Sequence, residues 1–183
     1  MKTMFRPSTA LVALTFASAI VASAQTPAAP PANPLSAGQK MIYGYISDIV
    51  VRSAEKMPEE NYGFKPTPDV RSFGQIVGHV ADAQYMFCSA VLGEKNPGLE
   101  IEKNKTAKAD LVKALKDAVA YCNRAHDGMT DATATQTVKV MGGDQAKLTV
   151  LSFNNVHTIE HYGNIITYLR LKGIVPPSSE PRK

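Results

Sequence analysis

The sequence predicts an all-α protein, a four-helix bundle with a small β-hairpin between its third and fourth helices. Apolar residues recur at intervals of three and four in four separate stretches, which is the spacing of a buried helix face. Capping residues, prolines and glycines separate these stretches. A single short segment rich in β-branched residues favours strands. With 183 residues, the chain is long enough for one domain with one hydrophobic core.

The N-terminus has the features of an export signal. Two basic residues, Lys2 and Arg6, precede a short apolar run (residues 11–21) and a small-x-small cleavage pattern (residues 22–24). We therefore expect residues 1–24 to be a signal peptide and the mature protein to be exported, either periplasmic or secreted. The apolar run is shorter than the ~20 residues that a membrane-spanning helix needs, so we expect no stable membrane insertion.

A proline- and alanine-rich segment separates this signal from the predicted domain. Four prolines fall within residues 25–35, which are therefore interpreted as an extended linker rather than as a helix. We expect the domain over residues 36–178 and a polar tail over residues 179–183.

The charge balance of the mature chain is ordinary. Lys2 and Arg6 fall in the signal, which leaves 18 of the 20 basic residues against 16 acidic ones. Between Lys95 and Lys116 the lysines alternate with acidic residues, as on a solvated helix face. We therefore expect no nucleic-acid partner.

Two helices are predicted in the first half of the domain. Isoleucines and valines at helical spacing predict an amphipathic helix over residues 36–57. Residues 59–71 contain two prolines and no periodicity, which indicates a loop. A second helix begins at the capping box formed by Ser72 and Gln75 and ends at Gly93.

The second half predicts two further helices and a hairpin. About a dozen residues without periodicity follow the second helix, enough to cross the length of the bundle. The third helix is expected from near Thr106 to near His126. Residues 137–148 place strand-favouring residues on both sides of a Gly-Gly turn, which predicts the hairpin. Helical spacing resumes over residues 150–172.

The two cysteines leave two alternatives open. Export would bring the protein into an oxidising compartment, which favours a disulfide between Cys88 and Cys122. Each cysteine falls late in its predicted helix, so the two come level only if those helices run parallel. The other alternative is a pair of buried, inert thiols.

Three histidines have the placement of metal ligands. His157 and His161 are four residues apart, so they project about 40° from each other on one helix face and can share an ion. That face is otherwise mostly apolar, where two imidazoles without a shared partner would be costly. On the second helix, His79 also points to the apolar side, beside the small residues Ala83 and Ala90. The sequence therefore predicts a metal site formed by His79, His157 and His161.

Such a site is typical of a catalytic metal, because three imidazoles leave a coordination position open for water or substrate. A closed structural zinc site would need a fourth protein ligand. Glu160 and Asp82 are the acidic residues placed nearest to the histidine face, so they are the candidate catalytic residues. His126 is interpreted as a structural residue that complements the dipole of the third helix. Residues 157–161 also match the inverted zinc-protease pattern H-x-x-E-H, but too little chain follows to supply the further ligand of such proteases.

Several short motifs occur in order along the predicted domain. They are Met57-Pro58-Glu59-Glu60, Phe64-Lys65-Pro66, Ser72-Phe73-Gly74-Gln75 leading to His79, His157-x-x-x-His161-Tyr162-Gly163-Asn164, Leu169-Arg170-Leu171-Lys172-Gly173 and Pro176-Pro177. In their order and spacing, over residues 36–178, they resemble the DinB/YfiT family of metalloenzymes. The resemblance implies an up-down-down-up bundle with a long connection, and a metal held by one histidine of the second helix and two of the fourth.

The resemblance also implies a range of activities. Some members of this family are thiol-dependent transferases or isomerases that act on small electrophiles and use the metal to activate a thiolate. We therefore expect a divalent metal ion, zinc first and nickel second, and a metal-dependent hydrolase or thiol-type transferase acting on a small molecule. The alternative is a non-catalytic exported bundle that binds metal or a small ligand. The expected partner is a small-molecule substrate or ligand, and formation of a homodimer is left open.

Overall fold

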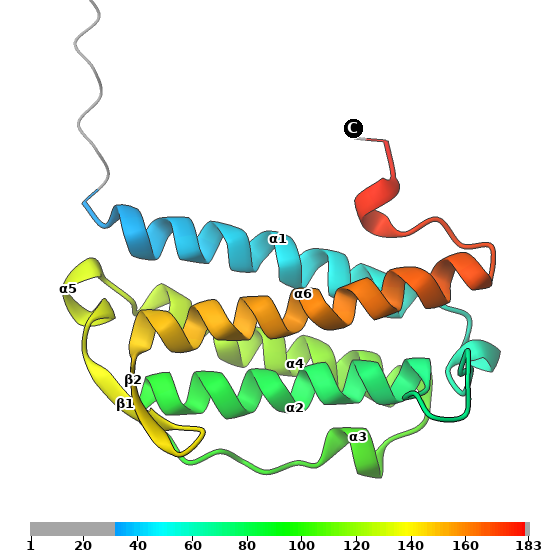
Figure 1. Ribbon diagram of the computed structural model, residues 1–183, viewed down its shortest axis with the longest axis horizontal. Helices are drawn as coiled ribbons and strands as arrows, with labels where there is room; N and C mark the ends of the chain where they lie inside the picture. The colour runs from blue at the N-terminus through cyan, green and yellow to red at the C-terminus, as the bar shows by residue number, and fades with distance from the viewer. Residues whose placement is uncertain (1–31, 182–183) are drawn as a thin grey trace, which may run out of the picture. The chain divides into compact units, whose positions relative to one another are not determined.

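Four long helices make up most of residues 32–181, the part of the chain that the computed structural model describes (Figure 1). They are α1 (Pro34–Lys56), α2 (Phe73–Leu92), α4 (Lys108–Asp127) and α6 (Lys147–Leu171). The shorter elements are the helices α3 (Ile101–Asn104) and α5 (Asp131–Ala134), the strands β1 (Thr137–Val140) and β2 (Gly143–Ala146), and the 3-10 turns η1 (Glu59–Asn61) and η2 (Pro177–Ser179). The predicted signal peptide, residues 1–24, lies outside the described residues. The predicted all-α bundle with one small hairpin is confirmed.

The long helices have the up-down-down-up arrangement that the family resemblance implied. Helices α1 and α6 run in one direction, and α2 and α4 run in the other (Figure 1). The connection over residues 93–107 makes this possible, because it carries the chain back along the length of α2 before α4 begins. Two neighbouring helices that run parallel need such a crossover.

Helix α1 begins two residues earlier than predicted, inside the segment interpreted as linker. Pro34 occupies a first-turn position, where its fixed φ suits a helix and its missing N–H would have had no partner. The carboxylate of Asp131, from α5, accepts hydrogen bonds from the backbone N–H groups of Leu35 and Ser36. A residue almost a hundred positions away thus satisfies the exposed donors of this helix end, which local sequence cannot reveal.

The ends of α2 agree with the prediction. Ser72 and Gln75 form both hydrogen bonds of the capping box. Gly93 has φ +71°, the left-handed conformation that ends many helices. The connection that follows was predicted to be irregular but contains α3, whose four residues are too few to display a helical period.

The hairpin is confirmed, and α6 begins earlier than predicted. β1 and β2 pair antiparallel, with Val140 opposite Gly143. Lys147 and Leu148, which the strand-like pattern assigns to the hairpin, form the first turn of α6. Leu148 packs against the same cluster of buried residues that contains Leu151, so burial in the bundle overrides local strand propensity here.

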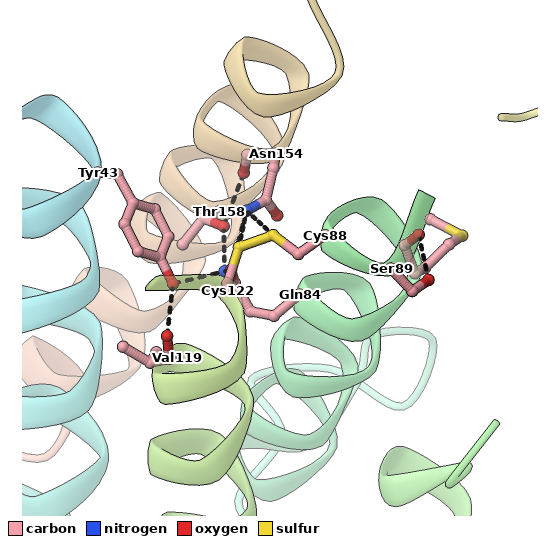
Figure 2. The surroundings of a disulfide bond; sticks show 9 residues. Tyr43, Gln84, Cys88, Ser89, Val119, Cys122, Asn154 and Thr158 are labelled. Carbon is pink, nitrogen blue, oxygen red and sulfur yellow. Dashed lines mark hydrogen bonds between the residues drawn. A yellow bond between two sulfur atoms is a disulfide. The ribbon is translucent and has the colours of Figure 1, made fainter. Parts of the chain in front are cut away.

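A buried disulfide joins Cys88 of α2 to Cys122 of α4 (Figure 2). Their Cα atoms are 5.2 Å apart. The parallel course of the two helices brings these late positions level, so the structure decides for the disulfide over two inert thiols.

Buried polar side chains surround this disulfide and join three helices (Figure 2). The Gln84 side-chain oxygen accepts hydrogen bonds from the Tyr43 hydroxyl at 3.2 Å and from the Asn154 amide at 2.8 Å. The Gln84 amide donates to the Thr158 hydroxyl at 3.0 Å. These bonds fix the register of α1, α2 and α6 next to the histidine-bearing positions of α6. No helix within residues 32–181 has the length and apolar character needed to cross a membrane.

Candidate metal centre

The three predicted ligands, which are far apart in sequence, meet between α2 and α6. The Nε2 atom of His157 lies 3.1 Å from Nε2 of His79 and 3.2 Å from Nε2 of His161. One ligand nitrogen from each of the three residues falls within 4.8 Å of the others. The i, i+4 spacing on α6 and the inward face of α2 therefore converge as the sequence predicted.

This geometry fits a divalent metal ion. Zinc–nitrogen bonds of about 2.0–2.1 Å separate two ligands by about 3.3 Å at tetrahedral angles and by about 2.9 Å at octahedral ones. The two contacts of His157 fall within that range. Three neutral imidazoles are a donor set that several divalent transition metals share, so the residues present fit a divalent ion.

The electrostatics favour the uncharged imidazoles that a metal requires. Burial, with the neighbouring imidazoles adding to it, lowers the pKa of His157 to about 4. Burial likewise lowers the pKa of His161. Both rings are therefore neutral at pH 7 and present lone pairs without first losing a proton.

The Glu102 carboxylate contacts the ring nitrogen of His79 that takes no part in the histidine cluster. Oε2 of Glu102, on α3, lies 2.9 Å from Nδ1 of His79. Oε1 of the same carboxylate accepts a hydrogen bond from Nε of Arg71 at 2.7 Å. Burial alone would raise the pKa of Glu102, but the hydrogen bonds from Arg71 and His79 outweigh it and lower that pKa. The ionised carboxylate therefore keeps the proton of His79 on Nδ1 and leaves Nε2 free as a ligand.

Glu102 and Arg71 were not predicted from the sequence. Glu102 lies among lysines and was interpreted as part of a solvated helix face. Its signal in the sequence is weak, because it lies 23 residues from His79 along a connection without periodicity.

The two candidate catalytic acids lie in different settings. Asp82 accepts hydrogen bonds from the backbone N–H groups of Ile101 and Glu102, both at 2.9 Å. Its two carboxylate oxygens thus hold the start of α3 against α2, and through α3 they position Glu102. Glu160 is exposed and is near enough to His161 to act on its pKa.

His126, the remaining histidine, takes no part in this cluster. Its ring stacks on Tyr43 with centroids 4.1 Å apart, and only 3% of the residue is exposed. Burial lowers the pKa of His126 to about 4, so it is neutral at pH 7. His126 is therefore a structural residue outside the metal centre, as the sequence predicts, and burial keeps its ring uncharged at the end of α4.

An open cavity of about 470 Å³ adjoins His161, one of the three histidines. His161, Glu102 and Arg71 are among the residues that line it, together with Tyr168 and Asn164. The hydroxyl of Tyr168 donates a hydrogen bond to the backbone carbonyl of Arg71, which holds the loop before α2 at the cavity wall. Water or a small molecule thus has room beside the candidate metal centre.

The fold and the site together define a class of protein: a four-helix bundle with a three-histidine candidate metal centre between two helices. The family model of the DinB superfamily matches residues 48–165, a range that includes all three histidines. The chain belongs to the DinB superfamily. Among proteins with curated descriptions, none matches the chain significantly in sequence.

Solved structures share the fold at low sequence identity. A DinB-like protein from Bacillus cereus is 17% identical, with a TM-score of 0.68 over 77% of this chain and 95% of its own. A DinB-like protein from Bacillus subtilis is 18% identical, with a TM-score of 0.65 over 80% of this chain and 99% of its own. A mycothiol-dependent maleylpyruvate isomerase is 14% identical, with a TM-score of 0.60 over 71% of this chain and 60% of its own. These similarities establish the fold of the chain.

Proposed function

We propose that the protein binds a divalent metal ion, zinc first and nickel second, at His79, His157 and His161, and acts on a small molecule as a metal-dependent hydrolase or thiol-type transferase. The observation that carries this proposal is the convergence of three imidazole nitrogens beside an open cavity. A bound divalent ion supplies Lewis acidity, which makes a water or thiol nucleophile available at neutral pH. Because the N-terminus has the features of a signal peptide, we further propose that the protein acts outside the cytoplasm.

The residues of the chain have distinct parts in this function. Glu102 accepts a hydrogen bond from the Nδ1–H group of His79 and so sets the tautomer and the ring orientation. The low pKa of His157 keeps it unprotonated over the whole physiological range. Glu160, exposed beside His161, is the candidate acid for proton transfer that the sequence places next to the ligands. The structural neighbour named as a mycothiol-dependent isomerase supports thiol-dependent chemistry as one of the possible activities.

A second candidate is a bundle that stores metal or binds a small ligand without turnover. The observation that favours it is the use of Asp82 in hydrogen bonds to the backbone of α3. Of the two acids predicted from the sequence, this leaves Glu160, which is exposed and is not among the residues that line the cavity beside His161.

Metal binding to tag-free protein tests the proposal directly. We expect the chelator-treated protein to take up one equivalent of zinc or nickel in competition with a chromophoric chelator. His157→Ala removes a ligand and is expected to weaken the affinity by at least about 100-fold. His126→Phe, which changes the histidine outside the cluster, is the matched control and should bind like the wild type.

Two results would contradict the proposal. One is a wild-type protein that takes up neither metal, and the other is equal binding by the wild type and His157→Ala. A screen of ester, amide and thiol-transfer substrates with the loaded protein then separates the two candidates. Turnover that His157→Ala abolishes excludes simple storage.

A further inference from the structure

A second cavity lies close to the candidate metal centre, on the side of the hairpin. It has a volume of about 280 Å³, is open to solvent on one side, and is lined by residues of the hairpin, α2 and α6. Figure 1 shows the hairpin lying against the end of α2 and the start of α6. We call this cavity the hairpin pocket; its lining residues are Phe87, Val140, Met141, Gly143, Gln145, Thr149, Val150 and Phe153.

The lining of the hairpin pocket is mostly apolar, with Gln145 and Thr149 as its polar side chains, and it contains no charged residue. Phe87 and Val150 form its buried walls, each 2% exposed. Phe153 and Met141 are 45% and 70% exposed, so large apolar side chains stand at its open side. Exposed aromatic and thioether groups around a concave surface are a feature of small-molecule sites.

The hairpin pocket and the metal centre share a wall. The ring of Phe87 packs edge-on against both Phe153 and His157, with centroid distances of 5.5 Å and 5.9 Å. Phe153 precedes His157 by four residues on α6, which is about 6 Å along the helix axis. The ring of Phe87 therefore contacts both the lining of the hairpin pocket and one of the three histidines.

The turn of the hairpin holds Met141 in an unusual conformation. Met141 has φ +53° and Gly142 has φ +81°, both in the left-handed region. Two-residue hairpin turns of this kind favour Asn or Gly at the first position, so methionine there is strained. Strain of this kind concentrates at functional sites. The turn thus places the flexible, polarizable side chain of Met141 at the open side of the pocket.

We propose that the hairpin pocket receives the apolar part of the substrate, an aryl group or a branched alkyl group, while the polar end of the same molecule lies at the three histidines. This inference rests on the proposed function and names its substrate class: a small amphipathic molecule with one apolar group. The volume is adequate, because an apolar cavity of about 150 Å³ already binds benzene. The uncharged lining excludes a second charged group at that end.

Two hydroxamates test the inference on the zinc-loaded full-length protein. Acetohydroxamate and benzohydroxamate carry the same metal-chelating group, and the second adds a phenyl ring. We expect benzohydroxamate to bind the wild type about tenfold more tightly, because the ring is buried in the pocket. Phe153→Ser and Met141→Ser each remove one exposed apolar side chain of the pocket. In both variants the ratio of the acetohydroxamate to the benzohydroxamate dissociation constant should fall toward 1. Val156→Ser is the matched control, since Val156 is an exposed apolar residue of α6 that does not line the pocket.

The outcomes separate this inference from the function on which it rests. If neither hydroxamate binds the zinc-loaded wild type, the bound metal has no open position, so the proposed function is refuted and the substrate class with it. If both bind and the ratio is the same in the wild type, Phe153→Ser and Met141→Ser, the metal centre stands and the pocket assignment is overturned. A Phe153→Ser protein with an unchanged ratio and an altered mass in sedimentation would make this wall a contact between copies, which also overturns it.

Discussion

The three site histidines are held to different degrees by the atoms behind them. Nδ1 of His79 is bound by the Glu102 carboxylate at 2.9 Å. Nδ1 of His161 has a longer contact, 3.5 Å, with the side-chain amide of Asn164. Nδ1 of His157 is buried without a hydrogen-bond partner in the described part of the chain. His79 is therefore the best-oriented ligand, and His157 depends on packing against its neighbours, among them the ring of Phe87.

His126 should make the protein sensitive to acid. Burial lowers its pKa in the folded state to about 4. The charge of Asp127 raises this pKa and the charge of Lys40 lowers it, and both effects are smaller than that of burial. In the unfolded chain its pKa is near 6.5, so between pH 6.5 and pH 4 the unfolded state binds the proton more strongly. The stabilisation is thus complete above pH 6.5 and is lost as the pH falls toward 4. At pH 5 the loss amounts to about 2 kcal/mol.

Replacing His126 by Phe keeps the stacking on Tyr43 and removes the titrating group. We expect the drop in unfolding free energy between pH 7.5 and pH 5 to be about 2 kcal/mol smaller in His126→Phe than in the wild type. Urea denaturation of both chelator-treated proteins at the two pH values measures this difference. An identical drop in both proteins would mean that His126 is already protonated in the folded state at pH 5.

At the scale of elements, the four-residue helix α3 controls how the site is supported. Glu100 at its start has φ +47°, and Asp82 binds two of its backbone N–H groups. The backbone of α3 also lies directly on α2 at Gly78. A Cβ atom added there would come within 2.6 Å of the Cα atom of Glu102. Only glycine at this position lets α3 come close enough for Glu102 to hold His79.

Gly78→Ala should therefore weaken metal binding without removing a ligand. The added methyl group pushes α3 away from α2, so Glu102 loses its contact with His79. We expect zinc affinity to fall about 10–100-fold while the helical circular dichroism is retained. Competition with a chromophoric chelator measures the affinity.

Gly163→Ala is the matched control for this change. Gly163 also lies in a long helix near the site, but a Cβ atom there would meet nothing within 4 Å. This variant should bind zinc like the wild type and gain about 1 kcal/mol of stability from the better helix propensity of alanine. Equal zinc affinity in the two variants would show that α3 has no part in holding the metal.

At the scale of the whole molecule, the site and the core use different parts of the bundle. The ligands come from α2 and α6 alone, whereas the larger core cluster draws its buried residues from all four long helices. The disulfide ties α2 to α4 independently of the site. The bundle therefore has enough apolar contact to fold around an empty site.

We expect the chelator-treated protein to remain helical and to melt cooperatively. Zinc should raise its melting temperature, and the rise should grow with the logarithm of the ratio of free metal to dissociation constant. At a hundredfold excess, bound zinc adds about 2.7 kcal/mol to the unfolding free energy. Thermal melts followed by circular dichroism, with and without chelator, measure both effects. A protein that is unfolded without metal would instead have a structural site, as small zinc domains do, which counts against an open catalytic position.

The sequence by itself determined the features that depend on neighbouring residues. Helical spacing located the four long helices, and the capping box of Ser72 and Gln75 set the start of α2. The i, i+4 interval of His157 and His161 was sufficient to place two imidazoles on one helix face. These signals are reliable because a helix repeats every 3.6 residues, so its buried face and its ends are recorded within a few residues of chain.

Only the tertiary structure decided the contacts that cross between elements. Cys88 meets Cys122 because a long connection makes α2 and α4 parallel, and Glu102 reaches His79 because Gly78 lets α3 lie against α2. The hairpin pocket likewise exists only where the turn at Met141 folds over α6. The path of an irregular connection has no period, so the partners of its residues are set by packing energy summed over the whole bundle rather than by the residues beside them.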